Sequence, residues 1–148
     1  MTALFTIGFT GKPASVFFNL LKKSAVKTVI DVRLHNTSQL AGFAKKEDLR
    51  YFLTEICNIA YVEAAELAPE PEMLKRYQKK EMSWNEYSDA YLNLISRRNV
   101  EKSLDKTSLV EGCLLCSEHL PHKCHRRLAA EYLHSKWGDS LQISHLVK

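Results

Sequence analysis

Residues 109–133, LVEGCLLCSEHLPHKCHRRLAAEYL, form the stretch around which the chain is organised. Residues 110–116 have the length and apolar composition of a buried strand, and a helical pattern resumes at Cys124. From Cys116 to Arg127 the sequence holds two cysteines, three histidines, one carboxylate and two arginines. Because ligands gather outside the carboxyl ends of strands in α/β proteins, this turn is a candidate site. We expect the rest of the chain to support the turn or to complete it.

The rest of the chain alternates between strand and helix patterns. Apolar strands are predicted at 3–8, 28–32, 59–63 and 141–147. Helices are predicted at 13–23, 46–57, 72–80, 84–97 and 126–136, with a helical turn at 100–106 and a capping box of Ser83 and Glu86. Aromatic residues between 77 and 91 predict a buried face, with a ligand groove as the alternative. This order predicts one α/β domain over residues 1–148, with a mostly parallel sheet of about five strands and helices on both faces.

Composition narrows the class of protein. The chain has 148 residues, a charged fraction of 26% and a net charge of +4, which is ordinary for a globular domain. No apolar run approaches the roughly 20 residues that span a bilayer, and no signal peptide is expected. We therefore expect a cytoplasmic protein whose four cysteines are thiols and which has no membrane association. An anionic small molecule or a nucleic acid is the expected partner, and the sequence carries no signal for an oligomeric state.

Cys124 stands at the predicted start of the last long helix, followed by His125 and Arg126. A thiol at a helix amino terminus near cations has the conditions that lower its pKa. The same position binds anions through free backbone N–H groups, and an arginine adds bidentate contacts to phosphate. The sequence therefore predicts either a reactive thiolate at Cys124 or an anion site that includes Arg126.

Cys116 ends the strand before the turn, two residues ahead of Glu118. Glu118 and His125 are candidate general acids or bases, and Cys116 or Cys124 is the candidate nucleophile. In the alternative interpretation Glu118 pairs with an arginine and Cys116 fills the core. Two other cysteines, Cys57 and Cys113, are predicted core thiols.

Asp31 and Arg33 follow the predicted strand at 28–32. Their position at a strand end predicts a substrate-binding role, with Arg33 and Arg126 holding one anionic group. An internal salt bridge that closes the loop is the alternative for Asp31 and Arg33.

Metal and cofactor sites are the alternatives to these interpretations. The glycine turn at 8–11 matches neither the dinucleotide fingerprint nor the P-loop, so no cofactor is predicted. Residues that offer sulfur or imidazole for zinc are Cys116, His119, His122, Cys124 and His125. Their spacing is not a CxxC pair facing another pair and cations lie nearby, so the sequence predicts no metal. A disulfide between Cys116 and Cys124 stays open as a further alternative.

Three motifs together resemble the DUF488 family of uncharacterised proteins. They are TIG at 6–8, DVR at 31–33, and a C-x-E…C-H-R turn that comprises Cys116, Glu118, Cys124, His125 and Arg126. The resemblance extends from residue 6 to about residue 146, and it implies an α/β fold in which these motifs converge, without an established reaction. Many family members have a histidine and a serine after TIG, where this chain has Phe9 and Thr10.

Three functional hypotheses follow. The first is an enzyme with a basic, thiol-containing crevice at the strand ends that acts on a phosphate-bearing substrate, either a nucleotide or a nucleic acid. The second is a nucleic-acid-binding module without catalysis, whose binding weakens steeply with salt. The third is a structural ion network without a site, in which loss of one charged partner strongly destabilises the fold.

Overall fold

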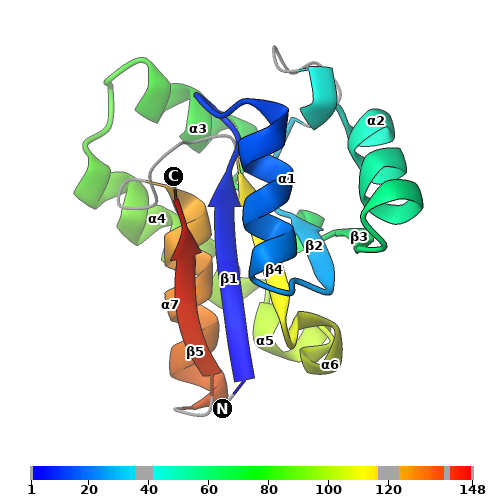
Figure 1. The fold of residues 1–148 in the computed structure, drawn as a ribbon. Coiled ribbons are helices and arrows are strands. Elements are labelled where there is room, and N and C mark those ends of the chain that lie inside the picture. Colours follow the sequence, from blue (N-terminus) through cyan, green and yellow to red (C-terminus); the bar gives the residue numbers. More distant parts are fainter. Residues whose placement is uncertain (1, 36–41, 117–123, 139–140, 148) are drawn as a thin grey trace.

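The computed structural model of the chain describes residues 2–35, 42–116, 124–138 and 141–147. Its centre is a five-stranded sheet with the strand order β3-β2-β4-β1-β5 (Figure 1). All strand pairs are parallel, which confirms the predicted α/β class. The strands are β1 (Thr2–Gly8), β2 (Thr28–Asp31), β3 (Ala60–Glu63), β4 (Gly112–Cys116) and β5 (Leu141–Leu146).

The helices lie close to their predicted positions. They are α1 (Ala14–Lys23), α2 (Lys46–Tyr51), α3 (Pro71–Gln78), α4 (Trp84–Arg97), α5 (Val100–Ser103), α6 (Lys106–Leu109) and α7 (His125–Trp137). The helix predicted at 46–57 changes at Phe52 to a π-helical turn, Phe52–Ile56. The strand predicted from residue 110 begins at Gly112, because Leu109 ends α6. Ser83 caps α4 and forms the predicted capping box with Glu86.

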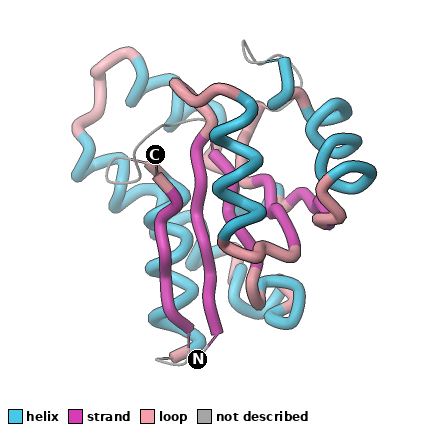
Figure 2. The backbone as a smooth tube through the Cα atoms, viewed as in Figure 1, coloured by secondary structure: helices cyan, strands magenta, loops and turns pink. Residues whose placement is uncertain are grey.

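Two apolar cores cover the two faces of the sheet. One core joins the sheet to α4 and α7, and it includes Leu114 of β4 and Leu128 of α7. The other joins the sheet to α1 and α2, and it includes Leu115 of β4 and Phe17 of α1. Figure 2 shows α1 on one side of the strands and α7 on the other. The prediction of helices on both faces is confirmed, and the alternation of Leu114 and Leu115 is what a strand buried on both faces requires.

All five strands run in the same direction, so their carboxyl ends share one edge of the sheet. Cys116 ends β4 at this edge and Asp31 ends β2. Cys124 caps the start of α7. None of the described helices is long and apolar enough to cross a membrane.

Candidate functional site

A contact between Cys116 and His125 forms the centre of the candidate site. The Cys116 sulfur lies 3.7 Å from Nδ1 of His125, within hydrogen-bonding reach for sulfur. Nε2 of the same ring lies 2.8 Å from the carbonyl oxygen of Val32, which follows β2. Because a carbonyl oxygen only accepts, Nε2 carries a proton, and Nδ1 of the neutral ring is left to accept the thiol proton. The ends of β4 and β2 therefore place a thiol and a base together.

Cys124 and Arg126 lie beside this pair at the start of α7. Cys124 is the N-cap residue, and its sulfur lies 3.8 Å from Nη1 of Arg126. It is also hydrogen-bonded to Cys116. Arg126 is fully buried, and a buried guanidinium is costly unless negative charge or acceptors surround it. The charge of Arg126 by itself therefore favours negative charge on the Cys124 sulfur.

Burial dominates the acidity of Cys124. Removal from water raises the pKa of its thiol well above the usual value, and the hydrogen bond and charge of Cys116 act in the same direction. The charge of Arg126 lowers this pKa without compensating for burial. The expectation that the helix end and its cations lower the pKa of Cys124 is therefore wrong, because the start of α7 is buried.

The pKa of His125 is also raised, which for an imidazole favours the charged form. Burial by itself would lower the pKa of the imidazole, but the charge of Cys116 and the hydrogen bonds to Cys116 and Val32 outweigh burial and raise it. A raised imidazole pKa is what a pair of thiolate and imidazolium requires. The Cys116–His125 pair can thus hold its proton on the sulfur or on the ring.

Two tyrosines of α4 complete the surroundings of the thiols. The ring centroid of Tyr91 lies 5.5 Å from that of His125, and its hydroxyl donates to the Leu67 carbonyl at 2.6 Å. Tyr87 is buried as well, and burial followed by the nearby sulfur charge raises its pKa. The predicted buried aromatic face is confirmed. Its contact with the site could not be read from helical spacing, because that contact depends on how α4 packs on α7.

Asp31 and Arg33 form a closed ion pair. Nε and Nη2 of Arg33 each donate to the Asp31 carboxylate at 2.8 Å, and Nη1 donates to the Ala44 carbonyl at 2.7 Å. Tyr61 of β3 donates its hydroxyl to the same carboxylate. The side chains of Arg33 and Asp31 are 3% and 0% exposed. These contacts fit the salt-bridge interpretation, and the only sequence signal for Tyr61 was its inward position on a short strand.

The two halves of the predicted site lie on opposite faces of the sheet. Asp31 is the register partner of Leu115, which belongs to the core with α1 and α2. Cys116 follows Leu115, so it faces the side covered by α7. The Val32 carbonyl, which lies next to Asp31 and Arg33 in the chain, accepts from His125 and so connects the two halves.

A pocket with a volume of about 250 Å³ opens at the carboxyl ends of β2 and β3. Its ionisable lining residues are Asp31, Arg33, Glu63, Glu70 and Arg98. Nη1 of Arg98 donates to the Glu66 and Ala68 carbonyls at 2.9 Å and 2.8 Å. The lining mixes both signs of charge and includes neither Cys116 nor Cys124, so the pocket and the thiol cluster are separate features.

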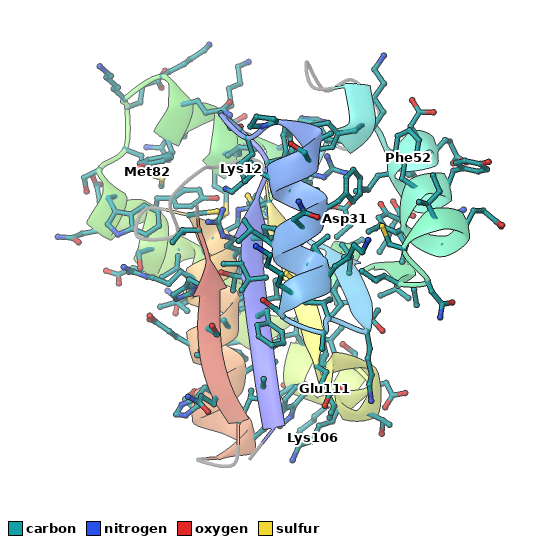
Figure 3. The ribbon with its side chains drawn as sticks, in the orientation of Figure 1. Lys12, Asp31, Phe52, Met82, Lys106 and Glu111 are labelled. Carbon is teal, nitrogen blue, oxygen red and sulfur yellow. The ribbon has the colours of Figure 1, made fainter. Side chains whose placement is uncertain are left out.

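Lys12 is a buried cation that sequence reasoning did not single out. It lies in the turn after β1 and donates to the Gly8 carbonyl at 2.7 Å. Figure 3 shows Lys12 and Asp31 toward the end of the sheet to which the strands point. A single lysine after a strand carries no pattern that predicts its burial.

The remaining predicted residues divide into two groups. Glu118, His119 and His122 lie outside the described residues. Cys113 is fully buried in the core, as predicted, and burial raises the pKa of its thiol. Cys57 is half-buried and packs against the core beneath α1 and α2.

One group of described side chains has the spacing of metal ligands. The sulfur atoms of Cys116 and Cys124 and a ring nitrogen of His125 all lie within 4.8 Å of one another. All three residues are buried. Two thiols, an imidazole and a guanidinium therefore converge at the junction of β4 and α7.

Comparison with protein families gives one match. The family described as "Domain of unknown function DUF488" matches residues 13–133, which include the DVR motif and the whole turn from Cys116 to Arg126. Comparisons with curated proteins and with solved structures gave no significant match.

Proposed function

The chain belongs to the DUF488 family, and we propose that it acts as a thiol enzyme on a phosphate-bearing substrate, a nucleotide or a nucleic acid. In this proposal Cys116 is the nucleophile, and His125 is the base that accepts its proton. Arg126 and the amino end of α7 hold the phosphate. The observation that carries the proposal is the 3.7 Å contact between Cys116 and a ring whose other nitrogen is fixed on Val32.

The reaction begins with transfer of the Cys116 thiol proton to Nδ1 of His125. The thiolate then donates an electron pair to an electrophilic centre of the substrate, which forms a bond between sulfur and that centre. The bond to the leaving group breaks, and the leaving group takes its electron pair and the proton from Nδ1. A nucleophile, a base and a third group that orients the base are the parts such chemistry requires. Here the Val32 carbonyl is the orienting group.

The phosphate contact rests on Arg126 and the helix terminus. The positive end of a helix dipole attracts an anion, and a guanidinium adds directed hydrogen bonds to phosphate. Arg33 is not given this role, because each nitrogen of its guanidinium already donates to Asp31 or Ala44. In this proposal Arg33 therefore supports the fold and does not bind the substrate.

The test is the rate at which iodoacetamide alkylates each cysteine of the native protein, followed by peptide mapping. Cys116 should react faster in the wild type than in His125→Gln, by about tenfold or more, because the variant cannot accept the thiol proton. His134→Gln is the matched control, since His134 lies on the same helix. Both variants should keep a cooperative thermal transition, which separates loss of the base from loss of the fold.

Phosphate binding is tested in the same assay. Inorganic phosphate and a mononucleotide should each slow alkylation of Cys116 in the wild type and in the control Arg127→Gln, but not in Arg126→Gln. If Cys116 is alkylated at the same rate in the wild type and in His125→Gln, the assignment of Cys116 as an activated nucleophile is refuted. Unchanged rates at millimolar phosphate and nucleotide would refute the phosphate contact.

A further inference from the structure

We propose that Cys116, Cys124 and His125 bind one Zn²⁺ ion. In the part of the chain that the structure describes, these are the side chains whose ligand atoms gather within 4.8 Å. Thiolate and imidazole are donors that zinc prefers, and three protein ligands are the number found at zinc sites that keep one position open. The cluster joins the end of β4 to the start of α7, so its geometry is fixed by the sheet and the helix.

The distance between the Cys116 sulfur and the His125 ring agrees with a tetrahedral ion. With zinc–sulfur bonds of about 2.3 Å and zinc–nitrogen bonds of about 2.05 Å, tetrahedral angles place neighbouring sulfur and nitrogen ligands roughly 3.6 Å apart. The Cys116 sulfur lies 3.7 Å from Nδ1 of His125. An ion can therefore be placed between these two atoms with little movement of the fold.

The orientation of His125 supplies independent support. A histidine that binds a metal through one nitrogen usually donates its other N–H to a carboxylate or a backbone carbonyl, which fixes the ring. Nε2 of His125 makes this contact with Val32 at 2.8 Å, and Nδ1 points at the thiol. The ring is thus held in the orientation that a ligand needs before any ion arrives.

The cation next to the cluster does not oppose binding. The sequence argued against a metal because arginines lie nearby, but Nη1 of Arg126 lies 3.8 Å from the Cys124 sulfur and donates to it. A donor to a ligand sulfur stabilises the thiolate. Two thiolates also neutralise the charge of Zn²⁺, so burial of the ion with its ligands adds no net charge to the core.

Zinc at this position would occupy the Cys116 sulfur. A bound ion would therefore block the nucleophile, and this regulatory consequence rests on the function proposed above. Binding of the ion itself does not depend on that function, because it needs only the three ligands. The experiment below separates the two.

The first measurement is a titration of the reduced full-length protein with Co²⁺, followed by displacement with Zn²⁺. One equivalent of Co²⁺ should give the sulfur-to-metal charge-transfer and visible bands of a tetrahedral thiolate site, and Zn²⁺ should abolish them. Cys116→Ser and Cys124→Ser should each lose these bands, and His125→Gln should weaken binding at least tenfold. Cys57→Ser and His134→Gln are matched controls that should bind like the wild type.

The second measurement needs no variant, so it holds even if a cysteine variant fails to fold. One equivalent of Zn²⁺ should slow iodoacetamide alkylation of both Cys116 and Cys124 at least tenfold and leave Cys57 unchanged. Absence of the cobalt bands, or equal alkylation with and without Zn²⁺, would overturn the metal site. A Cys116–Cys124 disulfide that persists after reduction would also overturn the metal site. If Zn²⁺ binds but metal-free Cys116 reacts no faster than in His125→Gln, the metal site stands and the proposed nucleophile fails.

Discussion

Asp31→Ala provides a direct test of the buried ion pair between Asp31 and Arg33. The substitution removes both acceptor oxygens of a carboxylate that Arg33 approaches at 2.8 Å through two nitrogens. It also removes the acceptor of the Tyr61 hydroxyl. The Arg33 side chain is only 3% exposed, so its charge cannot recover solvation from water without a rearrangement of the core. The substitution therefore leaves an uncompensated buried cation.

The expected cost follows from that burial. Breaking a buried ion pair by removal of one partner costs about 3–5 kcal/mol. Typical domains are stable by about 5–15 kcal/mol, so the loss is a large share of the free energy of unfolding. At a urea dependence of about 2 kcal/mol per molar, a loss of about 4 kcal/mol lowers the midpoint by roughly 2 M.

Urea unfolding followed by circular dichroism measures this change, and a second ion pair provides the control. Lys27 and Glu111 also approach to 2.8 Å, but their side chains are 73% and 40% exposed. Lys27→Gln should therefore cost less than about 1 kcal/mol. Replacement of Asp31 and Arg33 together by leucine and methionine should restore most of the lost stability, because no charge is then buried. A loss below about 1 kcal/mol for Asp31→Ala would refute the reasoning.

Three further predictions concern single contacts elsewhere in the fold. Gly112→Ala should cost about 1–3 kcal/mol in urea unfolding, because a Cβ would lie 2.6 Å from Cδ1 of Ile30, whereas Gly42→Ala meets open space and should be neutral. Ser83→Ala should cost about 1 kcal/mol, because the Ser83 hydroxyl accepts the N–H of Glu86 in the capping box of α4; an unchanged midpoint would contradict this role. His145 has a pKa lowered chiefly by burial and then by the charge of Arg126, which favours its neutral form in the folded protein. Its contribution to stability should be complete above about pH 6.5, the pKa in the unfolded chain, and should be lost as pH falls through the lower pKa in the folded protein. Urea unfolding at a series of pH values measures this dependence, and His145→Gln should flatten it over the same range.

The fold was largely predictable because its elements have local signals. The strands are short apolar runs, and α4 has both a capping box and an amphipathic face. Their alternation leaves a parallel sheet as the simplest architecture. The errors fell where the signal is weak. Val110 is apolar like the strand that follows, but α6 ends at Leu109 and Glu111 adopts a positive φ of 58°, so β4 starts only at Gly112.

The site was predictable in part. Cys116, Cys124 and His125 belong to one short stretch of sequence, and in the structure their ligand atoms lie within 4.8 Å of one another. The separation of Asp31 from the thiols depends on the register between β2 and β4, which pairs Asp31 with Leu115. A shift of one residue would turn Asp31 toward α7, and no local pattern in either strand specifies that register. The contacts of Tyr61 and Lys12 depend in the same way on packing between distant segments.

Burial also changes which thiol is the better nucleophile. The sequence leaves both Cys116 and Cys124 open as the nucleophile, but it gives Cys124 the conditions of a lowered pKa, at a helix amino terminus with cations on either side. That argument assumes contact with water, whereas Cys124 is 3% exposed and the cost of a buried thiolate outweighs the charge of Arg126. Cys116 is equally buried, but it has Nδ1 of His125 as a local proton acceptor. A thiol with its own base can lose its proton without transferring it to solvent. The proposed function therefore gives the reactive role to Cys116, because of its contact with His125, and not to Cys124 at the helix terminus.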